Sequence, residues 1–181
     1  MIEGNYDAVM VSSMTIGFSL AEQMAAELKA RNPAIKIILG GVHATVLREK
    51  TLEQCPWADY ACIGEGEDMI IPLLNHIAGV CGVSDIPNLV HRTPEGIKLN
   101  DVLPPTRLDT LPDFPWDLYP KNWIVQPKTG FCYVTATRGC PYNCYYCCNG
   151  VNLKLYGVGY LRSRPAKQVV KELIFLRDTY P

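Results

Sequence analysis

The chain has 181 residues, of which 48% are hydrophobic and 19% are charged, so it is typical of a globular protein with one domain or two small ones. The formal net charge is −1 and no basic run occurs, so charge gives no indication of binding to nucleic acid or to an anionic membrane. No apolar run approaches the roughly 18 residues of a membrane span, and residues 1–7 lack the basic start of a signal peptide, so we expect a cytoplasmic protein.

Residues 1–82 show the pattern of three successive βα units. Short, continuous apolar runs predict strands that are buried on both faces, and apolar residues at helical spacing predict the helices between them. The strands are expected at 6–12, 35–39 and 59–63, and the helices at 18–31, about 46–53 and 68–78. Such a succession predicts an α/β domain with a doubly wound, parallel, flavodoxin-like sheet.

Glycine or small polar residues follow each of the three expected strands, in loops 12–15, 40–45 and 64–67. Ligands of parallel sheets bind beyond the carboxyl ends of the strands, so these loops are candidate binding loops. The candidate cofactor-binding residues are Ser12, Ser13, Thr15, Gly40, Gly41, His43, Gly64 and Gly66. The simpler alternative is that they only form turns, and that Glu65 and Glu67 are acids favoured by a helix N-terminus.

Residues 83–127 have a different character and predict a hairpin followed by a linker. The hairpin is expected over 88–99, with Pro94-Glu95-Gly96 in its turn. Repeated prolines over 101–127 then predict an extended surface segment, anchored by aromatic side chains such as Trp116 and Trp123.

Residues 128–181 are expected to form a third region, with a strand over 131–137, a flexible loop over 150–159 and a helix over 165–179. Directly after the strand, Cys140, Cys144 and Cys147 fall at the spacing C-x3-C-x2-C. Thiolate sulfur suits iron–sulfur clusters, zinc and copper(I), and three local thiolates on a four-iron cluster would leave one iron open.

Two other interpretations of this cysteine loop stay open. A structural zinc site normally has four ligands, commonly in two C-x2-C pairs, whereas only Cys144 and Cys147 form such a pair here. A thioredoxin-like redox dithiol would leave Cys140 without a role. The remaining cysteines are read as bystanders, because free cysteine commonly behaves as a small buried hydrophobe.

The cysteine loop, with Arg138-Gly139 before it and Tyr146 before its third cysteine, resembles the signature of the radical S-adenosylmethionine enzymes. The resemblance implies that Cys140, Cys144 and Cys147 hold a 4Fe–4S cluster and that S-adenosylmethionine binds its open iron. It also implies reductive cleavage to a 5′-deoxyadenosyl radical, with Tyr146 packing beside the adenine. In that family the cysteine loop follows the first strand of a (β/α) barrel.

The arrangement Ser-x-x-Thr, Gly-Gly-x-His and Gly-Glu-Gly-Glu resembles the second half of the cobalamin-binding domain that precedes many radical S-adenosylmethionine cores. It implies that Ser12, Thr15, Gly40 and Gly41 line the pocket for the nucleotide tail of cobalamin. The family motif Asp-x-His-x-x-Gly is missing and His43 does not belong to it, so His43 is not the expected cobalt ligand. We therefore expect a fragment: a partial cobalamin-binding domain (1–82), hairpin and linker (83–127), and the start of the radical core (128–181).

The resemblance implies a cobalamin-dependent radical enzyme that acts on a small-molecule substrate by methyl transfer or rearrangement, with an electron donor of the flavodoxin or ferredoxin type as partner. No general acid or base is assigned, because the cofactors carry the chemistry. The alternative from another class is a non-catalytic, Rossmann-like ligand-binding module with a zinc-stabilised cysteine loop.

Overall fold

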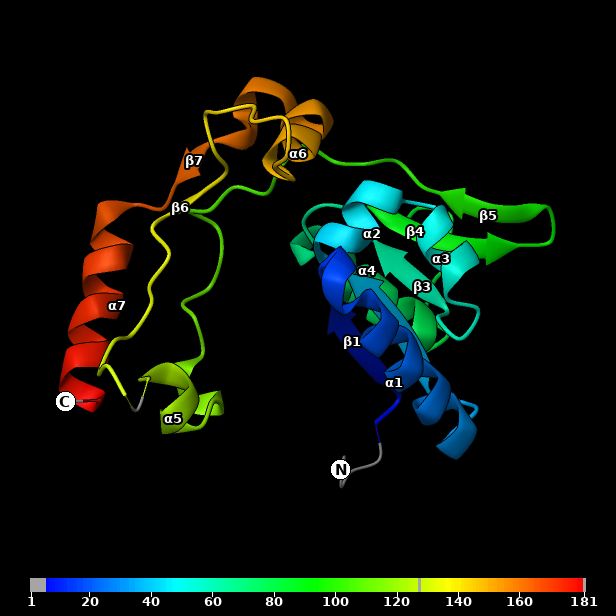
Figure 1. Cartoon of the computed structure of the whole chain (residues 1–181), viewed down its shortest axis with the longest axis horizontal. Coiled ribbons are helices and arrows are strands. Elements are labelled where there is room, and N and C mark those ends of the chain that lie inside the picture. The colour runs from blue at the N-terminus through cyan, green and yellow to red at the C-terminus, as the bar shows by residue number, and fades with distance from the viewer. Residues whose placement is uncertain (1–5, 127, 181) are drawn as a thin grey trace.

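A computed structural model describes residues 6–126 and 128–180, so residues 1–5, Pro127 at the end of the expected linker, and Pro181 lie outside the described residues. Its main feature is a five-stranded sheet with the strand order β1-β2-β3-β4-β5 (Figure 1). The strands are β1 (Ala8–Ser12), β2 (Lys36–Gly40), β3 (Tyr60–Cys62), β4 (Leu89–Thr93) and β5 (Gly96–Leu99). The first three pair in parallel, and the last two are antiparallel.

Helices cover both faces of this sheet. On one face lie α1 (Phe18–Arg31), α2 (Gly41–Leu47) and α3 (Lys50–Gln54), and on the other lies α4 (Glu67–Ile77). Consecutive residues of β2 serve the two cores: Ile37 and Leu39 pack toward the first group, and Ile38 packs toward α4. All three are at most 2% exposed, which explains why β2 reads as a continuous apolar run. The expected α/β fold is confirmed, with a mixed sheet.

The sheet differs from expectation in its last two strands. The hairpin that the sequence places outside the first domain extends the sheet, because β4 pairs with β3 through Ala61 opposite Val90. Val90 and Leu89 are fully buried. The physical reason is the exposed edge that a three-stranded sheet would leave along β3, which the hairpin covers.

Two expected loops are helical instead. Loop 40–45 shrinks to Gly40, because α2 begins at Gly41, where φ is +85°. His43 and Ala44 face inward and are at most 3% exposed. The polar and small residues that suggest a loop here thus belong to the buried face of a helix. The expected loop 150–159 contains the helix α6 (Asn149–Tyr156) followed by the 3-10 helix η3 (Gly157–Tyr160).

The third region contains less strand than expected. Only β6 (Thr137–Arg138) and β7 (Arg162–Ser163) pair, in an antiparallel two-stranded ribbon. Residues 131–136 have no ladder partner among the described residues, and a strand needs one for its hydrogen bonds. The expected start of a barrel is therefore not seen, although α7 (Ala166–Thr179) matches the expected last helix.

The linker carries a 3-10 helix, η2 (Trp116–Leu118), and the short helix α5 (Lys121–Ile124). Figure 1 shows α5 and α7 lying apart from the sheet, whereas α6 lies close to it. Trp116 anchors the linker on α7, because its indole Nε1 donates to Glu172 Oε1 at 2.8 Å. None of the helices in the described part of the chain is both long enough and apolar enough for a membrane crossing.

Candidate functional site

The carboxyl ends of β1, β2 and β3 meet at one edge of the sheet, where they border a cavity of about 400 Å³. Five of the candidate residues line it together: Ser12, Gly40, Gly41, Gly64 and Gly66. The other walls are mainly apolar and come from β1, β2, β3 and α4. Parallel packing thus gathers loops that are 24 to 28 residues apart, as the sequence predicts.

Gly41 is required by the close approach of the β1 loop. A Cβ there would lie 2.6 Å from Ser12 Oγ and 2.8 Å from the carbonyl oxygen of Ser13. The same loop is held by backbone hydrogen bonds from Ser13 N to Gly40 O and from His43 N to Ser13 O, both 3.1 Å long. Ser13 therefore contributes to the site through its backbone hydrogen bonds, which fix the β1 loop at the edge of the cavity.

His43 lies on the other side of this edge and is buried, whereas its partner Thr15 is exposed. The Nδ1 atom of His43 is 3.2 Å from Thr15 Oγ1, and its Nε2 atom is 3.2 Å from Gln54 Oε1. The imidazole also stacks on Phe18, with ring centroids 3.7 Å apart. With both nitrogens in hydrogen bonds, this side chain holds α2 against α1 and α3.

Cys62 also lines the cavity, but burial raises the pKa of its thiol to about 12, with the charge of Glu67 adding to the shift. Cys62 is therefore a neutral thiol at physiological pH. Because metals bind the thiolate, this residue suits an apolar wall rather than a ligand set.

A second cavity, of about 280 Å³, lies between the α/β domain and the cysteine segment, which we define as residues 137–163. Gly41, Thr45 and Gly64 line it from the domain, and Gly139 and Cys148 line it from the segment. Its walls thus come from the two parts of the chain that the sequence assigns to cofactor binding.

The three candidate metal ligands lie on one exposed turn of the segment. Cys144 is exposed, Cys140 and Cys147 are half-buried, and all are free thiols. The amide of Cys147 donates to Cys144 O at 3.1 Å, so the turn folds back between these residues. Tyr146 is 90% exposed, which leaves its ring free to contact a ligand.

This donor set fits a soft metal or an iron–sulfur cluster in its chemistry, because the thiols are free, accessible and close in sequence. Across residues 6–126 and 128–180, however, no three histidine, cysteine or carboxylate side chains gather closely enough to hold a metal ion. The cluster site thus remains a prediction from the spacing.

Glycine shapes the start of the cysteine turn. Gly139 has φ +96°, and a Cβ there would lie 2.3 Å from Tyr160 O, so only glycine fits against η3. Farther along, Tyr160 Oη donates to Asn149 Oδ1 at 2.8 Å and accepts from Asn152 Nδ2 at 2.9 Å. These contacts fold the chain after the cysteines into a compact unit rather than a flexible loop.

The structure adds residues that the sequence reading misses. Arg162 and Tyr156 bind Glu65 at the carboxyl end of β3, and Arg138 reaches Glu67 with 2.6 Å between Nη2 and Oε1. Burial alone would raise the pKa of Glu65, but Arg162, the amide of Thr106 and Arg138 together hold it below its usual value. No local motif marks Tyr156 and Arg162, because their partner Glu65 is 91 and 97 residues away in sequence.

Comparison with known families decides the identity of the α/β domain. Residues 1–74 match the B12 binding domain family. The chain carries a B12-binding domain. The expected resemblance to cobalamin-binding radical S-adenosylmethionine enzymes is confirmed as a resemblance, because solved structures of such enzymes share the fold of this chain.

Two relatives extend well beyond the B12-binding domain. An uncharacterized methyltransferase of Pyrococcus horikoshii is 26% identical over 96% of this chain and 40% of its own length. The anaerobic magnesium-protoporphyrin IX monomethyl ester cyclase of Rubrivivax gelatinosus is 27% identical over 92% of this chain and 30% of its own. Both matches therefore include the cysteine segment as well as the domain.

Solved structures show the same fold. The radical S-adenosylmethionine methyltransferase TsrM of Kitasatospora setae, solved with cobalamin and a 4Fe–4S cluster, matches with a TM-score of 0.71 at 17% identity over 98% of this chain and 37% of its own. The cobalamin-dependent radical enzyme OxsB with aqua-cobalamin matches with a TM-score of 0.74 at 19% identity, over 94% and 23%. The chain thus spans 23–40% of the length of these four relatives.

Proposed function

We propose that the chain belongs to a cobalamin-dependent radical S-adenosylmethionine enzyme that acts on a small molecule by methyl transfer or rearrangement. The observation that carries the proposal is the shared cavity. It places Gly41 and Gly64 of the B12-binding domain opposite Gly139 and Cys148 of the cysteine segment. A cofactor held by the domain would therefore meet a cofactor held by the segment.

Each part of the chain would then have a defined role. Cys140, Cys144 and Cys147 would hold the 4Fe–4S cluster through their thiolates, and Tyr146 would pack beside the adenine of S-adenosylmethionine. When bound, these groups supply reductive cleavage of the sulfonium, and cobalamin supplies a carrier for a methyl group.

The B12-binding domain would position cobalamin with its backbone and its apolar walls. Gly40, Gly41 and Gly64 carry no side chain, so a large planar ligand can approach the ends of β2 and β3 closely. Ser12 offers a hydroxyl at the rim. The apolar residues of the 400 Å³ cavity, such as Met69 and Ile70, would exclude water from the bound group.

Filling the larger cavity should weaken cobalamin binding. At Gly40 the backbone is extended, with φ −150°, and a Cβ would meet only Cys62 Cβ, at 3.8 Å. Gly40→Leu therefore fits without backbone strain and projects into the cavity. We expect its dissociation constant for hydroxocobalamin, measured by absorbance titration, to rise at least about tenfold, because one displaced contact of about 1.4 kcal/mol has that effect.

The matched control is Gly82→Leu, where a Cβ would meet nothing nearer than 4.0 Å and which does not line the 400 Å³ cavity. It should bind cobalamin as the unmodified protein does. Equal affinities in all three proteins would contradict the placement of cobalamin at this edge. They would favour a domain that serves only as a scaffold.

The non-catalytic alternative makes a different prediction for the cysteine turn. Under it, the protein purifies with one zinc ion per chain and shows no visible absorbance after anaerobic incubation with iron and sulfide. Under our proposal, the same incubation gives a brown protein with about four irons per chain.

A further inference from the structure

One carboxylate at the end of β3 joins three separate stretches of the chain. Glu65 Oε2 accepts from the amide of Thr106 at 2.9 Å and from Arg162 Nη1 at 3.0 Å. Its Oε1 atom pairs with Arg162 Nη2, and Arg138 Nη1 lies 3.7 Å from Oε2. The Glu65 and Arg162 side chains are only 14% and 15% exposed, so the two-pronged ion pair is largely shielded from water.

The backbone of Glu65 adds two contacts to the same junction. Its amide donates to Tyr156 Oη at 2.7 Å, and its carbonyl accepts from Asn88 Nδ2 at 2.8 Å. The neighbouring Gly64, at φ +72°, makes room for this, because a Cβ there would lie 1.8 Å from Tyr156 Oη. The hydroxyl of Tyr156 is thus seated in a gap that only glycine leaves.

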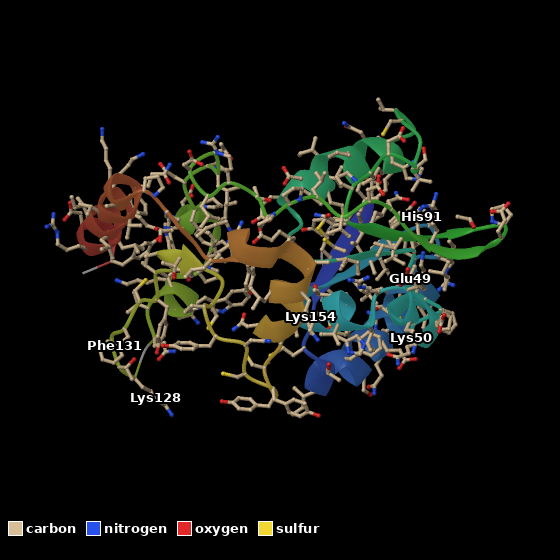
Figure 2. All side chains as sticks on the ribbon, turned by 90° about the horizontal axis from the view of Figure 1, so that it is seen from above. Glu49, Lys50, His91, Lys128, Phe131 and Lys154 are labelled. Carbon is tan, nitrogen blue, oxygen red and sulfur yellow. The ribbon has the colours of Figure 1, made fainter. Side chains whose placement is uncertain are left out.

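These contacts hold both ends of the cysteine turn. Arg138 lies two residues before Cys140, and Arg162 follows the turn after α6 and η3. The two arginines are also partners in the β6–β7 ribbon, where Arg138 stands opposite Arg162. Figures 1 and 2 agree that α6 lies against the B12-binding domain. Figure 2 labels Lys154 on this helix and shows Phe131 far from the domain.

A role limited to helix α4 does not account for this arrangement. Glu65 lies just before Gly66, the N-cap of α4, where an acid would favour the helix dipole. Its carboxylate oxygens nevertheless bind Thr106 of the linker and Arg162 of the segment. The Glu65 side chain thus connects the domain to the linker and to the cysteine segment.

We propose that Glu65 is the positioning residue that docks the cysteine segment onto the carboxyl edge of the B12-binding domain. Removing its charge releases the segment while the sheet stays folded. The consequence for the two cofactors rests on the proposed function: Gly64 lines both cavities, so the Glu65 junction sets how far the cysteine turn stands from a ligand of the domain.

The test is Glu65→Gln, followed by hydrogen–deuterium exchange with mass spectrometry. Glutamine keeps the size of the side chain but loses the ion pair with Arg162. Amides of residues 137–163 are expected to exchange at least about tenfold faster, while β2 keeps its protection. The matched control is Glu27→Gln, which removes an exposed ion pair to Arg31 on α1 and should change neither region.

Arg162→Gln approaches the same junction from the segment side and leaves the B12-binding domain unmodified. It should release residues 137–163 as Glu65→Gln does. The effects of the two single changes should not add in the double variant, because both remove the Glu65–Arg162 ion pair. Unchanged exchange in the segment would overturn the proposal. So would loss of β2 protection in both single variants, because the pair would then stabilise the whole fold rather than dock a segment.

Failure of the proposed function would look different. The exchange experiment needs no cofactor, so it can succeed in a protein that binds neither cobalamin nor iron. In that case Glu65 still docks the segment, and only the role of the junction in cofactor spacing is lost.

Discussion

Replacing Cys144 by alanine should abolish the iron–sulfur absorbance of the anaerobically reconstituted protein. Cys140, Cys144 and Cys147 are the only cysteines at the spacing C-x3-C-x2-C, and the loss of one leaves two thiolates, which cannot hold three corners of a four-iron cluster. We expect the iron content to fall from about four per chain to less than one. Colorimetric iron analysis and the visible spectrum measure this.

Cys81→Ala is the matched control. Cys81 is also an exposed free thiol, but it lies after α4, and its Sγ donates to the carbonyl oxygen of Pro72 at 3.5 Å. It should leave the iron content unchanged. An equal loss in both variants would mean that iron binds loosely to surface thiols, and a cluster retained by Cys144→Ala would remove Cys144 from the ligand set.

Replacing Leu39 by alanine should cost about 2–5 kcal/mol of unfolding free energy, which is a large share of the stability of an ordinary domain. Leu39, the next-to-last residue of β2, is 1% exposed and packs in the core beneath α1 and α2. The loss of its side chain leaves a cavity between the sheet and these helices. Urea unfolding followed by circular dichroism gives the change.

Leu20→Ala is the control for this loss, because the same atoms are removed from a side chain that is 63% exposed on α1. A surface change of this kind is expected to stay within about 0.5 kcal/mol. If both variants lost equal stability, β2 would not be the centre of the core, and the packing of the B12-binding domain would need to be revised.

The sequence predicts the βα part of the fold well because each element there has its own periodicity. Helix α1 lies at its expected bounds, 18–31, and β2 lies within one residue of its own. The sequence also predicts the hairpin itself, but the pairing of the hairpin with β3 is a long-range contact that no local pattern reveals. Residues 131–136 alternate as a strand does, yet periodicity cannot supply the partner that a ladder needs.

One part of the candidate site could likewise be predicted from the sequence, and another part could not. The glycine loops could be predicted, because strand ends of a parallel sheet meet at one edge, and Gly40, Gly41 and Gly64 do border one cavity. The docking junction could not be predicted, because the local sequence around Glu65 indicates only an acid at a helix N-terminus. Its partners Tyr156 and Arg162 lie in or beside a stretch whose glycines suggest a loop.

Electron paramagnetic resonance of the reduced, anaerobically reconstituted protein, recorded with and without S-adenosylmethionine, tests the central claim most directly. If three thiolates leave one iron open, added S-adenosylmethionine binds that iron and changes the g-values of the cluster signal. A signal that S-adenosylmethionine leaves unchanged, or a protein that holds one zinc ion and gives no cluster signal, would contradict the account.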